Sequence, residues 1–182
     1  MSRKTSYLIT AFGKDRPGIV AGVSRILYEI GANIEDASMT RLGNEFTMML
    51  VVNLPASVSA AKLENGLKSV HKKLGVQTTS KIIPYVGGAR VQGAPPKYMI
   101  SVYGIDHPGI VYRVTDELAK RNISITDLQT KVTTGIKPVY IMFLEVQVPS
   151  TTDTDDLRAA LDQLTRDLKV EISLQDIESI AL

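Results

Sequence analysis

The stretch GKDRPGIV at residues 13–20 recurs as GIDHPGIV at residues 104–111. Aligning the chain with itself at an offset of 91 residues extends this match to residues 13–36 and 104–127, where ten of 24 positions are identical. Each eight-residue stretch, which we call an octet, lies between a short apolar segment and a segment with apolar residues at helical spacing. Self-similarity at one fixed offset indicates a duplicated structural unit.

Both copies predict the same order of elements: strand, helix, strand, strand, helix, strand. In the first copy, strands are expected at residues 6–12, from Ile34, at 46–54 and at 76–83, and their counterparts are 97–103, from Ile125, 139–148 and 170–177. The first helix of each copy is expected to begin at Pro17 or Pro108, because the fixed φ of proline suits a first helical turn. These helices should end at Gly31 and Asn122, which tolerate the left-handed conformation after a helix. The second helices carry leucine and valine at i, i+4, i+7 and i+11: Leu63, Leu67, Val70 and Leu74, and Leu157, Leu161, Leu164 and Leu168.

This order, with right-handed crossovers, places the first and third strands of each copy centrally and both helices on one face. The predicted fold is therefore α/β (α+β), with two ferredoxin-like βαββαβ units and antiparallel sheets. Residues 1–84 form the first expected domain and residues 97–182 the second. Residues 85–96, rich in glycine and proline, are expected to link them.

Composition narrows the classes of function. The chain has 182 residues and no cysteine, which excludes disulfides, thiolate metal sites and a cysteine nucleophile. Its net charge of +2 argues against a dedicated nucleic-acid surface. Neither a signal peptide nor a membrane span is evident, and a cytoplasmic protein is expected. No motif indicates catalytic residues, a metal site or a cofactor.

The octets have a geometry that suits a small zwitterion. A chain that leaves a strand and enters a helix exposes amide hydrogens without intrahelical acceptors, here those of Gly18 and Ile19 and of Gly109 and Ile110. These donors and the positive end of the helix attract a carboxylate. Asp15 and Asp106 precede the helix by one position too many for a simple N-cap, so their carboxylates are expected to be free for an ammonium. The same Pro-Gly pairs are equally consistent with folding signals alone, and the aspartates with local turns.

The octets, the segment Gly31-Ala32-Asn33-Ile34 and the βαββαβ order resemble ACT domains, and the tandem arrangement resembles the glycine cleavage system transcriptional repressor group. The resemblance implies a non-enzymatic regulatory module that binds an amino acid such as glycine or serine where the first loop of one unit meets a neighbouring unit. It also implies that Asn33 and Ser124 complete the two pockets. The candidate ligand-binding residues are Asp15, Arg16, Pro17, Gly18, Ile19, Asn33, Ile34, Asp106, His107, Pro108, Gly109, Ile110, Ser124 and Ile125.

Other readings of the same fold stay open. Arg16 favours an acylphosphatase-like hydrolase, although the second copy has His107 there. Tyr103 and Phe143 are too few for the aromatic platform of an RNA-binding sheet. A dimerisation module without a ligand is a further alternative, because an exposed edge strand can pair with another chain. A protein partner or a homodimer is expected both for the ligand-binding regulator and for the dimerisation module.

Overall fold

Each copy of the repeat folds into four strands and two helices in the predicted order. The structure, a computed structural model, describes residues 5–84, 97–134 and 138–177. The chain divides into two compact units, residues 1–90 and 91–182, which we call unit 1 and unit 2. The predicted linker, residues 85–96, lies outside the described residues.

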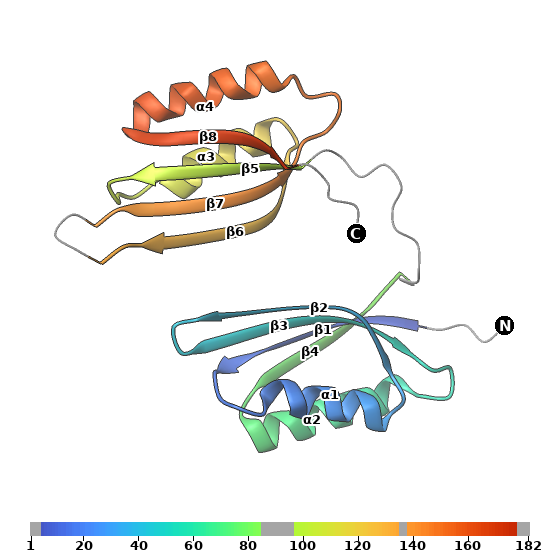
Figure 1. Ribbon diagram of the computed structural model, residues 1–182. Coiled ribbons are helices and arrows are strands. Elements are labelled where there is room, and N and C mark those ends of the chain that lie inside the picture. The colour runs from blue at the N-terminus through green and yellow to red at the C-terminus, as the bar shows by residue number, and fades with distance from the viewer. Residues whose placement is uncertain (1–4, 85–96, 135–137, 178–182) are drawn as a thin grey trace. The chain divides into compact units, whose positions relative to one another are not determined.

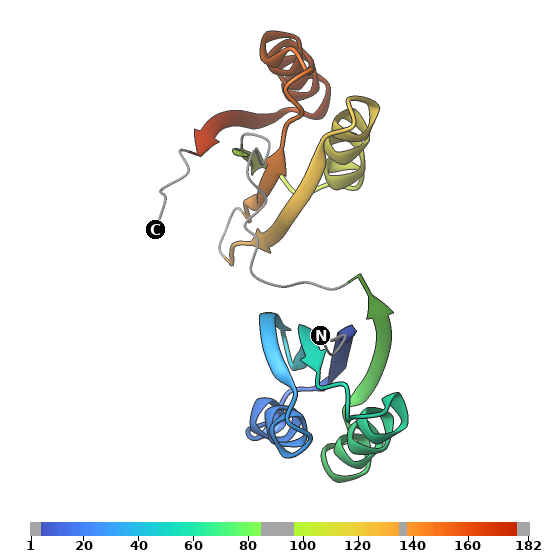
Figure 2. The same ribbon diagram turned by 90° about the vertical axis from the view of Figure 1, so that its right-hand side faces the viewer.

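Unit 1 contains β1 (Thr5–Lys14), α1 (Ile19–Glu29), β2 (Asn33–Leu42), β3 (Glu45–Leu54), α2 (Ala60–Leu74) and β4 (Gln77–Ile83). Unit 2 contains β5 (Lys97–Gly104), α3 (Ile110–Lys120), β6 (Ser124–Val132), β7 (Tyr140–Gln147), α4 (Thr154–Leu168) and β8 (Val170–Ile177). Figure 1 shows both helices of each unit on one face of its sheet, and Figure 2 shows the same two layers from the side. This is the predicted pair of ferredoxin-like α+β units.

The strand order is β2-β3-β1-β4 in unit 1 and β6-β7-β5-β8 in unit 2, and all neighbours are antiparallel. The first and third strands of each unit are therefore central, as predicted. The register is equivalent in the two sheets, since Gly13 lies opposite Phe46 and Gly104 opposite Tyr140. Each octet thus begins at the same end of its sheet.

The helix-facing side chains of the central strands form one core in each unit. Alternate residues of β3 (Phe46, Met48, Leu50 and Val52) and of β7 (Tyr140, Met142, Leu144 and Val146) are buried. The predicted apolar stripe of the second helix packs against these residues. All four stripe residues of α4 are buried, and in α2 all are buried except Leu74, which is half-buried. Burial of each such side chain stabilises the fold by about 1.5–3 kcal/mol. Each core determines which face of β1 or β5 lies against the helices, and these two strands lead into the octets.

The ends of α1 and α3 agree with the sequence prediction. Gly31 and Asn122 have positive φ values of 72° and 53°. The amide of the following residue donates to the carbonyl three residues before the C-cap, from Ala32 to Leu27 at 2.9 Å and from Ile123 to Leu118 at 3.1 Å. These bonds satisfy carbonyls that the end of a helix leaves without partners.

The predicted starts of α1 and α3 were wrong by two residues. Pro17 and Pro108 lie in a turn, and the helices begin at Ile19 and Ile110. Gly18 and Gly109 are the N-caps, with φ values of 94° and 103°. A residue with a Cβ atom is strained there, so the turn needs glycine and the helix starts after it.

The edge strands β2 and β6 are exposed along their whole length. Each contains a shift in register at the same place, between Ile34 and Asp36 and between Ile125 and Asp127. Apolar side chains on the helix-facing side of these strands remain partly open to solvent, among them Met39 and Leu128. Within the described residues, no helix is long and apolar enough to cross a membrane.

Candidate functional site

The two octets form corners with the same backbone, which we call the octet corners. In each, the N-terminus of the following helix receives no side-chain capping bond from the described residues and has no acidic residue in its first turn. The second helix of each unit is different, because Ser59 caps α2 and Asp153 caps α4 through their side chains. Among the described helices, α1 and α3 are therefore the two whose first-turn amides meet no side-chain acceptor, and these amides can donate to a ligand.

The N-cap glycines keep this helix end open. A Cβ atom built at Gly18 or Gly109 would meet no atom within 4 Å. In unit 1 the corner borders a hollow of about 510 Å³, lined by Asp15, Arg16, Pro17, Gly18, Ile19, Val20, Ala21, Met39 and Phe46. Five candidate residues, Asp15 to Ile19, thus line one hollow at a helix N-terminus, where an anion is favoured.

The Asp15 carboxylate is not free, contrary to the sequence prediction. Its Oδ2 atom lies 3.4 Å from a guanidinium nitrogen of Arg41 on β2. The pair is partly exposed, so its net contribution to stability is small, about 0–1 kcal/mol. The Asp15 amide also donates to the carbonyl of Asn44 at 2.7 Å, which joins the octet to the β2–β3 hairpin.

Arg16 and His107 both bond to the C-terminal end of the second helix of their unit. Arg16 donates to the carbonyl of Lys73 at 3.1 Å, and His107 Nε2 lies 2.9 Å from the carbonyl of Leu168. Cations at this end of a helix are stabilised by the free carbonyls and the helix dipole. Both side chains therefore contact a helix end, and one guanidinium nitrogen of Arg16, the residue that favoured the acylphosphatase-like reading, is used in this contact.

The carbonyl of Leu168 raises the pKa of His107 above its ordinary value, and the carbonyl of Pro108, 3.1 Å from Nδ1, raises it further. Two carbonyls facing the two ring nitrogens are both satisfied only by the doubly protonated ring.

Asp106 has different neighbours from Asp15. Among the described residues its carboxylate makes no hydrogen bond or ion pair. Tyr140 takes the place of Phe46 in β7, and burial, followed by the negative charge of Asp106, raises the pKa of its hydroxyl. The unit 2 corner therefore offers an acidic group that forms no ion pair with the described residues, although its charge contributes to the raised pKa of the neighbouring His107.

Asn33 and Ser124 do not lie with the octets of their own units. Asn33 is paired with Asn53, whereas the octet residue Gly13 is paired with Phe46, seven positions earlier in β3. Seven strand residues span about 23 Å. Ser124 pairs with Gln147 and Gly104 with Tyr140, which gives the same separation in unit 2. A pocket formed by one unit alone cannot use both ends.

Asn33 is also occupied within its own unit. Its side-chain amide donates to Glu35 Oε1 at 2.7 Å, and the Asn53 amide donates to the same oxygen at 2.7 Å. The neighbouring candidates Ile34 and Ile125 are 38% and 37% exposed on the edge strands, so they present apolar surface to solvent.

Arg41 and Tyr140 were missed in the sequence. Both come from the β2–β3 or β6–β7 hairpin, which folds back beside the octet. Arg41 lies three positions before the turn residue Asn44, whose carbonyl accepts from Asp15. A hairpin register drawn from the two-residue Gly43-Asn44 turn would have brought Arg41 to the octet.

Comparison with known proteins agrees with this architecture. The ACT domain family matches residues 5–81 and again residues 98–168. The glycine cleavage system transcriptional repressor of Escherichia coli K12 is 27% identical over 179 residues, which cover 96% of this chain and 91% of that protein. A UPF0237 protein of Methanopyrus kandleri is 48% identical over 73 residues, which cover 40% of this chain and 81% of its own.

A solved structure of an unknown protein from Galdieria sulphuraria has a TM-score of 0.82 at 28% identity and covers 96% of this chain and 99% of its own. Two family matches in succession, a tandem βαββαβ fold and a relative that spans almost the whole chain agree with one another. The chain belongs to the ACT domain family and consists of two ACT domains in tandem.

Proposed function

We propose that the protein is a non-enzymatic regulator that binds a small amino acid at its octet corners and transmits the binding to a protein partner. The observation that carries this proposal is the open helix N-terminus at both octets, beside a position of the repeat that is aspartate in both units. In the same units, by contrast, the N-termini of α2 and α4 are capped by side chains. The relation to a protein named for glycine cleavage supports glycine metabolism as the regulated process.

Both ends of an amino acid find partners at such a corner. The ligand carboxylate accepts hydrogen bonds from first-turn amides, which a helix N-terminus supplies together with its positive dipole end. The ligand ammonium pairs with Asp15 or Asp106. In unit 1 the ammonium competes with Arg41 for Asp15, whereas Asp106 forms no ion pair with the described residues and faces only the charge of the neighbouring His107. Unit 2 is therefore the stronger of the two sites in this proposal.

A neighbouring ACT unit from a second copy would close the pocket. The lining of the hollow of unit 1 includes Met39, which is 53% exposed on the edge strand β2. An added unit would cover partly exposed apolar side chains there and contribute polar groups to the ligand. Ligand binding would then favour one arrangement of units through its differential affinity, which is how the signal reaches a partner.

The test is a thermal-unfolding screen of the whole chain against the common amino acids. A ligand that binds the folded state raises the free energy of unfolding by mass action, by about 2.7 kcal/mol at 100 times its Kd. The melting temperature therefore rises with the ligand concentration. We expect glycine or serine to produce this rise. Asp106→Ala should remove most of it, and the double variant with Asp15→Ala should remove all of it.

Matched controls separate loss of the site from loss of the fold. Asp155→Ala changes an exposed acid at the capped start of α4 and should leave the ligand-dependent rise intact. Absence of any amino-acid-dependent rise, or a rise that survives in the double variant, would refute binding at the octet corners.

A further inference from the structure

A groove of about 360 Å³ runs between α1 and α2 of unit 1, the two helices that lie side by side in Figure 2. Buried and half-buried apolar side chains line its floor, and exposed charged side chains line its rim. The floor residues are Ile26, Val70 and Leu74, and the rim residues are Arg25, Glu29 and Lys73. We propose that this groove docks an acidic helical segment of a protein partner, with an apolar side chain of that segment on the floor.

The groove is open because α1 has a glycine where it meets α2. A Cβ atom at Gly22 would lie 2.5 Å from Leu74 Cδ1, so the leucine packs directly against this glycine. Gly66 of α2 lies against Ile26 of α1 in the same way. Since Gly22 has no side chain, nothing at this position covers the apolar floor.

An ion pair bridges the two helices at the same place in unit 2. The octet alignment makes Arg113 the counterpart of Gly22, and the leucine positions of α2 and α4, which align at an offset of 94 residues, make Asp167 the counterpart of Lys73. A guanidinium nitrogen of Arg113 lies 3.2 Å from Asp167 Oδ2. Unit 2 thus supplies its own anion between the helices, whereas unit 1 has a cation and no bridging side chain.

The charge of the groove selects an acidic partner. Glu29, the acid on the rim, is paired with Arg25 at 2.7 Å. Lys73 forms no ion pair with the described residues. Arg16 comes to the same end of the groove, where its guanidinium donates to the carbonyl of Lys73 at 3.1 Å. Two cations without a carboxylate partner on α2 or beside it therefore lie together there.

A further lysine extends this basic surface along α2. Lys62, Gly66, Ser69 and Lys73 recur at i, i+4, i+7 and i+11, so they lie along the side of the helix that borders α1. Lys62 is in the first turn, where the helix dipole disfavours a cation, so helix stability does not explain it. Eleven helical residues span about 16 Å. Carboxylates about three turns apart on a partner helix would match the two lysines.

The acidic helix of this chain does not fit the groove. α4 carries Asp155, Asp156, Asp162 and Asp167, but the large apolar side chains that are exposed in the described residues all lie on other segments. A second copy would therefore bring the charge without an apolar side chain for the floor. A different protein is the occupant that satisfies both features.

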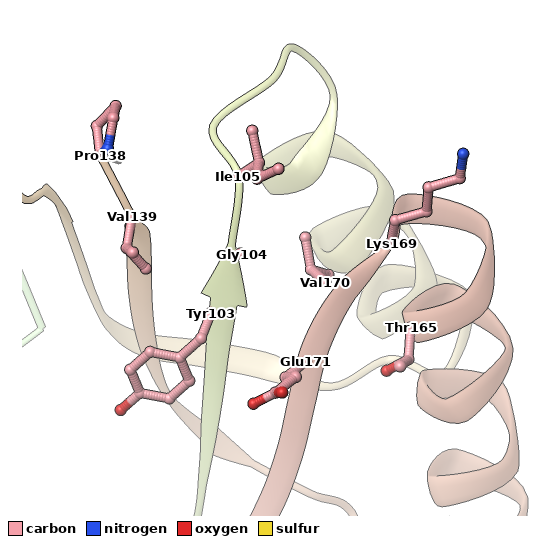
Figure 3. A pocket seen from close by; sticks show the side chains of 9 residues that line it. All are labelled: Tyr103, Gly104, Ile105, Pro138, Val139, Thr165, Lys169, Val170 and Glu171. Atoms are coloured by element: carbon pink, nitrogen blue, oxygen red, sulfur yellow. The ribbon is translucent and has the colours of Figure 1, made fainter. Parts of the chain in front are cut away.

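A hollow of about 600 Å³ at the end of the unit 2 sheet lacks this convergence of charge. Figure 3 shows Glu171 and Thr165 on either side of β8, and Lys169 extending away from both. Its polar groups thus point in different directions, whereas Arg16 and Lys73 meet at one end of the groove in unit 1.

The groove also reaches the octet corner of unit 1. Gly18 lines both the groove and the hollow beside the octet. A docked partner therefore lies next to the ligand of the proposed function, and each can change the affinity of the other. The inference rests on that function only in assuming a protein partner.

The experiment is an amide NMR titration of the full chain with the acetylated and amidated peptide EELAALLAALEE, which carries carboxylates about three helical turns apart around leucines. The matched peptides KKLAALLAALKK and EESAASSAASEE reverse the charge and remove the apolar side chains. We expect the signals of Gly22, Ile26, Ser69 and Val70 to move with the first peptide and with neither control. Added salt should weaken the binding, because it screens exposed charges.

Variants test the groove residues. Lys73→Gln should weaken binding of the acidic peptide about two- to fivefold, the scale of one exposed ion pair. Lys68→Gln removes the same charge outside the groove lining and should change the affinity less. Gly22→Arg together with Lys73→Asp installs the ion pair of unit 2 and should abolish binding. In unit 2, Arg113→Gly together with Asp167→Lys should create a response between α3 and α4.

Three results would overturn the proposal: equal binding of either control peptide, unchanged affinity in the folded double variant of unit 1, or tighter binding of a DNA duplex to the same signals. Self-association of the chain that displaces the peptide would also overturn it, because the groove would then belong to a second copy. If the double variant does not fold, Lys73→Gln and the transfer to unit 2 decide the question.

The titration contains no amino acid, so it does not depend on the octet ligand. Asp15→Ala and Asp106→Ala should therefore leave peptide binding intact even where they remove the amino-acid-dependent rise in melting temperature. Lys73→Gln should in turn leave that rise intact. Failure of one site is thus distinguishable from failure of the other.

Discussion

The octet corner of unit 1 holds its acidic side chain against Arg41, whereas the corner of unit 2 leaves Asp106 beside Tyr140 without an ion pair among the described residues. Their backbones are nevertheless alike, with N-cap glycines at φ 94° and 103°. The residue after each aspartate also has the same role, since Arg16 and His107 both bond to a carbonyl at the end of the second helix.

Features that both corners share belong to the fold, whereas features that differ between them can change the binding of a ligand. The glycine and the helix-end bond occur in both units, so they are needed to form the corner. The partner of the aspartate differs between units, so it is the feature that can tune binding. Arg16 and His107 both make this helix-end bond, and their contact with a ligand stays a prediction.

The largest effect is expected at the N-cap glycines. Gly18→Ala and Gly109→Ala place a side chain at a backbone conformation that only glycine adopts without strain, at a loss of about 1–3 kcal/mol of unfolding free energy each. No neighbouring atom would be touched, so the two losses should be similar. Urea unfolding followed through the NMR signals of each unit measures them. A loss in one unit alone would contradict the shared backbone requirement.

The next largest loss of unfolding free energy is expected when the N-cap residues of α2 and α4 are replaced. Ser59→Ala and Asp153→Ala should each lower the unfolding free energy by about 1 kcal/mol, because each removes a side-chain acceptor of helix N-terminal amides. Asp15→Ala and Asp106→Ala remove no cap, so they should cost less than the cap variants in the same urea experiment. If the octet aspartates cost as much as the caps, they have a structural role and the ligand-binding reading weakens.

A smaller effect is expected from Arg41→Ala. The pair with Asp15 is partly exposed, and its loss should change the unfolding free energy by less than about 1 kcal/mol. The same variant frees Asp15 and makes the first corner resemble the second. In the amino-acid screen, the contribution of unit 1, measured in an Asp106→Ala background, should rise; a fall would mean that Arg41 binds the ligand itself.

The smallest effect is a pH dependence confined to unit 2. The folded-state pKa of His107 is raised by the carbonyl of Leu168, so its stabilising contribution is fully present below the unfolded-state pKa. That contribution is lost as pH rises through the raised folded-state pKa. Unit 2 should therefore lose stability just above the ordinary histidine range, and His107→Arg should remove this loss.

The comparison with unit 1 provides the control, because Arg16 stays charged throughout this range. The pH titration of the His107 ring signals gives the folded-state pKa directly. An ordinary or lowered value would show that the Leu168 contact is absent in solution.

The repeat made most of the fold readable from the sequence. Alternation in β3 and β7, the stripes of α2 and α4, and the stops at Gly31 and Asn122 all depend on local patterns that the second copy repeats. Local patterns fail at the helix starts, where they predict proline as the first helical residue and the helices begin two residues later. The left-handed glycine after it postpones the helix, and the Pro-Gly pair does not distinguish the two possibilities.

The site was less predictable because its residues come from different elements. The pairing of Asp15 with Arg41 depends on how the β2–β3 hairpin lies beside the octet. The distance between the octet and Asn33 follows from the 11 residues of α1, which carry the chain back along the sheet. A helix of that length spans about 16 Å, so the length of the helical pattern already predicts that the octet and Asn33 lie far apart.

The shift in register near the start of β2 and β6 limits how these units can add strands. A regular ladder on the outer edge of β2 can run only through the residues after the shift, from Asp36 to Leu42, and β6 is interrupted at the same point. Such an interruption twists an edge and shortens the template it offers to another chain. Open-ended growth into fibres is thereby discouraged, while a short, closed pairing between two chains remains geometrically available.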